Sequence, residues 1–105
     1  MKFFKIVTTT PISNAEAIRK AAGDAGAGTL GNYSHTSFSS RGVGRFLPKE
    51  RAHPAIGSVG AHEEVEEERI EWTCAHDKAQ TVVEAIRKAH PYEEPVIDVY
   101  PLEII

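Results

Sequence analysis

The stretch His90-Pro91-Tyr92-Glu93-Glu94-Pro95 separates an amphipathic helix pattern from a strand pattern. Proline fixes its own φ and disfavours the helical conformation in the residue before it. We therefore expect the preceding helix to end near His90 and Glu94 to be extended where the next strand begins. A turn this rigid holds its polar side chains in fixed directions. That property suits a binding site, but it equally suits a simple helix stop.

The segments on either side of this stretch predict one helix and two strands. Asp77 is placed to cap a helix that runs to about residue 89, since Ala79, Val82, Val83, Ile86 and Ala89 share one face. Residues 66–74, with Ile70, Trp72 and Cys74 on one face, predict a strand before the helix, and residues 96–102 predict the last strand after it.

The N-terminal half has the same layout. Residues 2–9 predict a strand with apolar residues on both faces, and Ser13 with Glu16 has the spacing of a capping box that opens a helix. Glycines then end that helix, and Asn32 to Leu47 predicts a strand bent near its two glycines. Residues 48–64 form a long connection, of a length that is usually functional or flexible.

The predicted order is βαββαβ in a single domain, residues 1–105. The six-residue sequence Glu16–Ala21 recurs as Glu84–Ala89 at the same place in each half. We therefore predict an α+β, ferredoxin-like sandwich in which two helices cover one face of an antiparallel sheet.

This topology predicts two consequences. Residues 9–13, 48–64 and 90–95 should cluster at one end of the sheet, while His35 and His76 lie at the other. The face of the sheet without helices carries apolar residues from the first and last strands, so we expect a homo-oligomer packed through that face. The residues expected to share the first end are His53, His62, His90, Glu93 and Glu94.

The composition argues against several classes of function, among them nucleic-acid binding and membrane insertion. The 105 residues carry a net charge of −3, which gives no electrostatic reason to expect nucleic acid. A single cysteine, Cys74, suits a reducing compartment, and no signal peptide or long apolar run is present. We therefore expect a cytoplasmic protein that binds neither nucleic acid nor membrane.

The rigid turn offers the first candidate site. Imidazole nitrogen and carboxylate oxygen are good ligands for zinc or copper, so His90, Glu93 and Glu94 could bind a metal or the polar group of a small molecule. The alternative is structural: the prolines set the turn, the Tyr92 ring packs and the carboxylates pair locally.

The second candidate site lies in the predicted second strand. Tyr33, His35 and Ser37 would share one face of it and could line a polar pocket at an oligomer interface. With Tyr92 of the turn, they are the candidate ligand-binding residues. The alternative is a solvated strand face.

Other polar groups have simpler explanations. His53 and His62 suit exposed loop positions. The glutamates of residues 63–68 are expected to pair across a hairpin with the basic residues of 41–51. No phosphate loop and no Ser-His-Asp or Cys-His arrangement has support in the sequence, and a thiol on an apolar strand face is usually inert. The sequence thus favours a protein that is not an enzyme.

The residues also resemble a known family. Residues 89–95, followed by Asp98-Val99-Tyr100-Pro101-Leu102, are similar to the end of the domain inserted in YqfO-type, Nif-like dinuclear-metal proteins. The stretches 31–39 and 57–60 match the same domain, and the resemblance covers about residues 3–102. The turn also resembles the CutA family, with PII-type signalling proteins as wider relatives. The resemblance implies a ferredoxin-like fold and assembly as a trimer.

Two departures limit what the resemblance implies. The resemblance implies that the metal-binding residues of full-length members lie in flanking domains, which we expect to be absent from this protein. Thr36 also stands where the family often has a cysteine. We therefore expect a stand-alone, non-enzymatic, CutA/PII-like homo-oligomer that binds a small ligand or a divalent metal, such as zinc or copper, in clefts between subunits. The alternatives are a metal-dependent hydrolase of the Nif-like family and an assembly or docking module for a partner protein.

Overall fold

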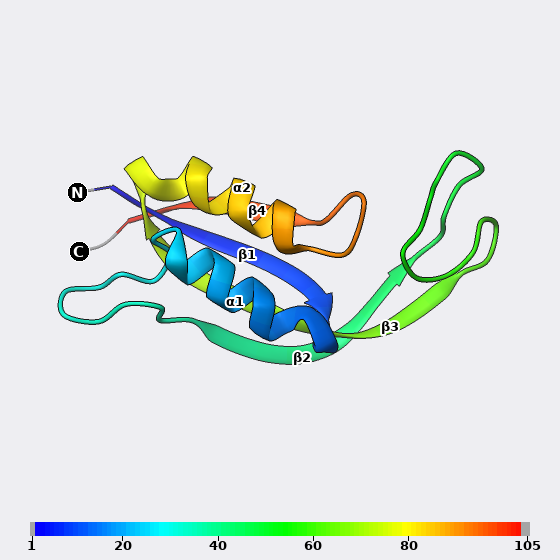
Figure 1. Ribbon diagram of the computed structural model, residues 1–105, viewed down its shortest axis with the longest axis horizontal. Coiled ribbons are helices and arrows are strands. Elements are labelled where there is room, and N and C mark those ends of the chain that lie inside the picture. The colour runs from blue at the N-terminus through cyan, green and yellow to red at the C-terminus, as the bar shows by residue number, and fades with distance from the viewer. Residues whose placement is uncertain (1, 104–105) are drawn as a thin grey trace.

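The computed structural model describes residues 2–103 and confirms the βαββαβ order (Figure 1). One antiparallel sheet has the strand order β2-β3-β1-β4, and both helices cover the same face of it. Two short 3-10 turns, η1 and η2, lead into the helices. The elements are β1 (Phe3–Pro11), η1 (Ile12–Asn14), α1 (Ala15–Asp24), β2 (Phe38–Phe46), β3 (Glu63–Ala75), η2 (His76–Lys78), α2 (Ala79–Ala89) and β4 (Ile97–Leu102).

The core lies between the two central strands and the helices. Ile6 of β1 faces Trp72 of β3 in the register, and both are buried with Ile18 of α1 and Ile86 of α2. Alternation along a strand places Val7 on the opposite face, and Val7 is also buried within this one chain. The predicted apolar face of α2 forms part of the core, since Ala79, Val82 and Ile86 are buried in it.

Both predicted helix caps are wrong. Ser13 lies inside η1 and Asp77 inside η2, and neither helix has a side-chain cap hydrogen bond. Instead, the backbone N–H of Ala15 donates to the carbonyl of Ile12, and the N–H of Ala79 donates to that of His76. The 3-10 turns thus satisfy N–H groups that a capping side chain would otherwise serve.

The predicted second strand is wrong in its first half, because β2 begins at Phe38 rather than at Asn32. The chain before it forms a folded loop in which Thr36 donates to the carbonyl of Gly28 from its N–H (3.1 Å) and its hydroxyl (2.8 Å). His35 has a φ of 60°, which breaks an extended strand. Tyr33, His35 and Ser37 therefore lie in a loop and do not share a strand face.

Strand β3 is longer than predicted and forms a projecting arm with β2. The pairing of β1 with β3 ends at Pro11 opposite Glu67, while β2 pairs with β3 as far as Phe46 opposite Glu63. This hairpin and its tip extend beyond the helices at one end of the molecule (Figure 1), whose extents are 46 × 23 × 22 Å. No helix within residues 2–103 is long and apolar enough to cross a membrane.

Candidate ligand cavity

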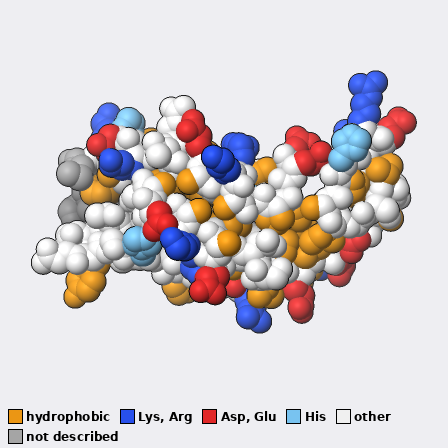
Figure 2. All heavy atoms as spheres, in the orientation of Figure 1, with side chains coloured by type: hydrophobic (Ala, Val, Ile, Leu, Met, Phe, Trp, Pro, Cys, Tyr) orange, Lys and Arg blue, Asp and Glu red, His pale blue; other side chains and the backbone are white. Residues whose placement is uncertain are grey.

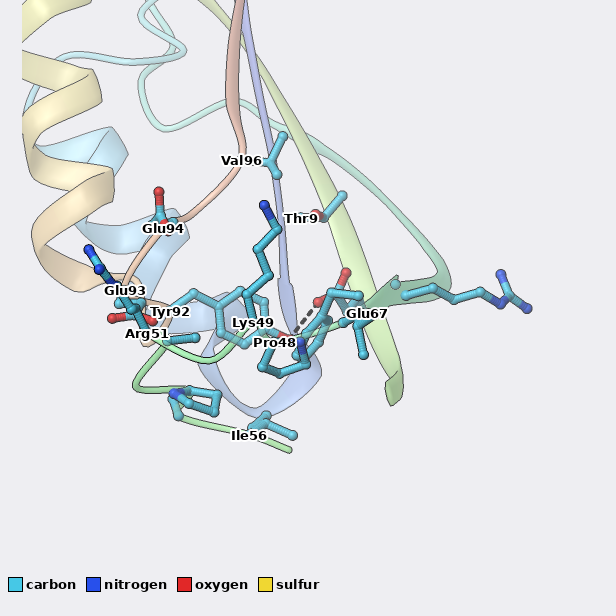
Figure 3. Close-up of a pocket in the computed structure, with 17 residues that line it drawn as sticks. Thr9, Pro48, Lys49, Arg51, Ile56, Glu67, Tyr92, Glu93, Glu94 and Val96 are labelled. Carbon is cyan, nitrogen blue, oxygen red and sulfur yellow. Dashed lines mark hydrogen bonds between the residues drawn. The ribbon is translucent and has the colours of Figure 1, made fainter. Parts of the chain in front are cut away.

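A cavity of about 550 Å³ lies where the arm meets the turn after α2 (Figure 3). In Figure 2, hydrophobic side chains gather between the body of the molecule and the projecting arm. The lining is mostly apolar and includes three basic and three acidic side chains. The lining residues are Thr9, Gly44, Arg45, Phe46, Leu47, Pro48, Lys49, Arg51, Ala52, Pro54, Ala55, Ile56, Glu67, Tyr92, Glu93, Glu94 and Val96.

The turn that forms one wall is built around His90. Helix α2 ends at Ala89, and His90 is extended (φ −76°, ψ 137°), as Pro91 predicts. The Nε2–H of His90 donates to the carbonyl of Thr9 (2.8 Å), since Nδ1 accepts the N–H of Tyr92 (3.1 Å). Burial lowers the pKa of His90, which favours this neutral form. Both ring nitrogens are therefore engaged by the backbone.

Tyr92 of the turn lines the cavity and contacts the arm. Its ring contacts Phe46 of the arm edge to face, with ring centroids 5.8 Å apart. Its hydroxyl donates to Oε2 of Glu67 at 2.7 Å, drawn as the dashed line in Figure 3. Burial, followed by the neighbouring Glu67 carboxylate, raises the pKa of Tyr92, so the hydroxyl stays protonated and remains a donor.

Glu67 is the acidic group that completes this contact, and its local sequence does not distinguish it from the neighbouring glutamates. Its side chain lies on β3, and the residue is only 7% exposed. Gly44 of β2 leaves the space that it needs, because a Cβ at position 44 would lie 2.1 Å from Glu67 Oε1. The register of β2 with β3, which the sequence does not reveal, places Gly44 diagonally across from Glu67.

The predicted clustering of the three loops is confirmed. The backbone N–H of His53, in the tip of the arm, donates to Oε1 of Glu93 at 2.8 Å, and His90 contacts Thr9. Glu94 lines the same cavity and is exposed. Within the part of the chain that the structure describes, no group of three or more His, Cys, Asp or Glu residues is placed to hold a metal ion. A metal bound by His90, Glu93 and Glu94 stays a prediction.

The other predicted ligand-binding residues lie at the opposite end of the molecule. His35 Nε2 lies 2.9 Å from Oδ1 of Asp24, and Nδ1 lies 2.9 Å from the Ser34 hydroxyl. Hydrogen bonds from His35 and Lys20 lower the pKa of Asp24. The structure thus contains a Ser-His-Asp contact that the sequence did not indicate, on an exposed loop. Tyr33, 74% exposed, and Ser37 are not brought to the Tyr92 cavity.

The acidic residues of β3 have different partners. Arg45 pairs with Glu64 directly across the hairpin (3.2 Å), as predicted. Glu68 instead pairs with Arg19 of α1, because alternation turns it toward the helices. The cross-strand prediction therefore holds for one pair and is wrong for Glu67 and Glu68.

The fold has close relatives among solved structures. It matches the divalent cation tolerance protein CutA of Archaeoglobus fulgidus with a TM-score of 0.71 at 20% identity, over 97% of this chain and 85% of that one. It matches GlnK of Bacillus subtilis, solved as a complex with ATP, with a TM-score of 0.64 at 18% identity, over 97% and 84%. The chain is therefore an α+β domain with the CutA/PII-like fold.

Sequence similarity shows which proteins the chain is related to within this fold. The chain is 46% identical over 99 residues to a GTP cyclohydrolase 1 type 2 homolog of Halalkalibacterium halodurans, covering 94% of this chain and 27% of that protein. It is 48% identical over 98 residues to the homolog of Mycobacterium tuberculosis (93% and 26%). A Bacillus cereus protein related to NIF3 gives a TM-score of 0.85 at 47% identity, over 98% and 26%. No family model matches the chain.

The chain is thus a homologue of one segment of the GTP cyclohydrolase 1 type 2 homologs, and the predicted resemblance to YqfO-type, Nif-like proteins is confirmed. It spans about a quarter of the length of the curated relatives that it matches.

Proposed function

We propose that the protein is a non-enzymatic, homo-oligomeric CutA/PII-like module that binds a small ligand in the cavity between the arm and the His90–Pro95 turn. The proposal rests on two hydrogen bonds that hold the turn against the arm beside this cavity. Glu93 holds the arm tip through the His53 N–H, while Tyr92 joins the turn to Glu67 of the arm. A simple helix stop needs neither contact.

The size and lining of the cavity support a small molecule as the ligand. Its volume of about 550 Å³ is within the usual range for ligand sites, which combine apolar walls with few polar groups. Phe46, Pro48 and Ile56 supply apolar surface, and Lys49 and Arg51 supply positive charge at the same wall. Such a lining suits a molecule that has an apolar body and an anionic group.

A divalent metal is the second ligand class, with Glu93 and Glu94 as its oxygen ligands. Both carboxylates line the cavity, and both residues are exposed there. The engaged nitrogens of His90 favour the small molecule over the metal, because a metal would have to displace the Thr9 carbonyl or the Tyr92 N–H. Metal analysis of the purified protein addresses the hydrolase alternative: two tightly held metals per chain would support it.

Isothermal titration with zinc, copper and common nucleotides tests the proposal. We expect saturable binding of at least one of them, abolished by Ile56→Arg in the cavity wall and retained by Val59→Arg. Val59 lies on the same connection but is exposed and outside the lining. No heat of binding from any of these ligands would count against the proposal.

Homo-oligomer formation, with a trimer favoured, is the other part of the proposal. Phe38 of β2 lies opposite Glu71, and Tyr100 of β4 lies opposite Lys5, so both point to the face of the sheet that the helices leave open. They are 68% and 47% exposed in one chain. Burying them against a second copy would remove this apolar surface from water.

A further inference from the structure

Glu67 is only 7% exposed, and one of its two carboxylate oxygens accepts a hydrogen bond from the described chain. Oε2 accepts the Tyr92 hydroxyl, whereas Oε1 accepts no hydrogen bond from residues 2–103. Oε1 faces the space that Gly44 leaves open, and Glu67 lines the cavity (Figure 3). Among the described residues, no side-chain oxygen or nitrogen that is fully shielded from solvent lacks a hydrogen-bond partner, so the unpartnered Oε1 retains contact with solvent in a residue that lines the cavity.

Most of the Glu67 side chain is shielded from water, yet the described chain supplies one donor to its carboxylate. A buried charge is normally paired with a cation or surrounded by several donors, because removing it from water is costly. Glu67 has a neutral phenol as its donor, while Glu68, one residue later, is paired with Arg19. A donor brought by a ligand would complete the hydrogen bonding of Glu67.

The basic groups of the same cavity are available for the other end of such a ligand. Neither Lys49 nor Arg51 makes an ion pair with any residue of the described chain, and both are exposed. Arg45 differs from them, since it pairs with Glu64. The cavity thus has an acceptor in its wall, two cations and apolar surface from Phe46.

We propose that the cavity binds a small molecule with a cationic or N–H donor group for Glu67, an anionic group for Lys49 and Arg51, and an apolar body between them. This inference rests on the proposed ligand-binding function and specifies the ligand class. Glu67 is a specificity-determining residue on this proposal, because it selects molecules that carry a donor.

Three matched probes test this inference: 4-(aminomethyl)benzoate, which has both charged groups, benzoate, which lacks the donor, and benzylamine, which lacks the anion. Binding is followed by chemical-shift changes of the cavity residues in two-dimensional NMR. We expect 4-(aminomethyl)benzoate to bind at least about tenfold more tightly than either of the others, because charge-assisted hydrogen bonds are the strong ones.

Variants then assign the two ends. Glu67→Gln should lower the affinity for 4-(aminomethyl)benzoate to that for benzoate and leave benzoate unchanged, and the NMR spectrum checks that the variant is folded. The double variant Lys49→Ala, Arg51→Ala should lower the affinity for benzoate and for 4-(aminomethyl)benzoate. Its affinity for benzylamine should be unchanged.

The outcomes separate the two proposals. Equal affinity of the wild-type protein for benzoate and 4-(aminomethyl)benzoate would overturn the assignment of Glu67 and leave cavity binding intact. Absence of shifts at the cavity with all three probes would overturn the ligand class. If zinc, copper and nucleotides also fail to bind, the proposed function fails with it.

Discussion

Tyr92 and Glu67 depend on one another, because the Tyr92 hydroxyl needs an acceptor and the Glu67 carboxylate needs a donor. The phenol donates to a carboxylate that has no other donor among residues 2–103, and that carboxylate in turn raises the pKa of the phenol. The pair joins the turn after α2 to the arm and so fixes the shape of the cavity between them. Removing the hydroxyl of Tyr92 should therefore lower the stability of the fold.

Removal of that hydroxyl gives the first prediction. Tyr92→Phe leaves a buried carboxylate without its donor, so we expect the free energy of unfolding to fall by about 1–3 kcal/mol. Urea denaturation measures the change. Tyr33→Phe is the matched control, since the Tyr33 side chain is exposed and should change stability by less than about 0.5 kcal/mol. Equal stability of the Tyr92 variant and the wild type would contradict the role given to this bond.

His90 gives a prediction about pH. Burial holds its pKa below the ordinary value of 6.5, so the unfolded chain takes up this proton at a higher pH than the folded chain does. The stability that neutral His90 contributes is therefore intact above that value. It is lost progressively as the pH falls, until the folded state is protonated too.

Urea denaturation at pH values of about 7.5 and about 5.5 measures this loss. We expect His90→Gln to be less stable than the wild type at the higher pH, and the difference between them to narrow at the lower pH. His62→Gln, which removes an exposed histidine, controls for the change of residue type. A difference for His90→Gln that widens on acidification would have the wrong sign.

These two residues differ in how far the sequence could predict them. His90 as the end of α2 follows from the proline after it, which is a local rule. Glu67 could not be chosen among the glutamates of residues 63–68, because its local sequence resembles that of its neighbours. Its role depends on Tyr92, 25 residues later, and on the space at Gly44 across the hairpin.

At the scale of elements, the loop between α1 and β2 was the least predictable part. Its aromatic, Ser and Thr residues are typical of a strand, and they led to the wrong start for β2. The loop is instead held by long-range contacts: Gly28 donates to the carbonyl of Thr73, and His35 lies against Gly23 and Asp24. Such contacts leave no periodic pattern in the sequence.

Two glycines of this loop give a matched pair of predictions. Gly28 and Gly31 both have positive φ (75° and 57°), but a Cβ at Gly28 would lie 2.1 Å from the Thr36 carbonyl oxygen, whereas one at Gly31 meets nothing within 4 Å. Gly31→Ala should cost about 1 kcal/mol for the left-handed conformation alone. Gly28→Ala should cost more than about 3 kcal/mol, because a backbone atom must move.

Thermal and urea denaturation of the two variants compare these costs. Stabilities within about 0.5 kcal/mol of one another would show that the loop adapts freely, contrary to the packing described. His35 and Gly23 belong to the same packed region, since a Cβ at Gly23 would lie 2.2 Å from the His35 ring.

At the scale of the whole molecule, the fold was predictable because each half repeats a simple pattern. Apolar residues with a helical period follow a strand in each half, and glycines end the first helix as Pro91 ends the second. The βαββαβ order and the clustering of three loops were therefore confirmed. The length of the arm was not predictable. It depends on how far β2 and β3 continue to pair beyond the end of β1, which the alternation of residues 63–66 does not indicate.

The open face of the sheet gives the last prediction. It is less apolar than the sequence suggested, since Arg69 and Glu71 form an ion pair there (3.0 Å) and Val7 is buried within one chain. Phe38 and Tyr100 are the large apolar side chains that this face exposes most. If copies of the chain pack through it, Phe38→Lys should replace apolar contact with a charged group that must be removed from water at the interface, which is unfavourable.

We therefore expect light scattering at micromolar concentration to give an oligomeric mass, with a trimer favoured, for the wild type and a monomeric mass for Phe38→Lys. Val43→Lys is the matched control. Val43 lies on the same strand and is also exposed, but alternation places it on the opposite face of the sheet. Dissociation by Val43→Lys rather than by Phe38→Lys would assign the contact to the other face. A monomeric wild type would remove the oligomer from the proposed function while leaving the cavity within one chain unaffected.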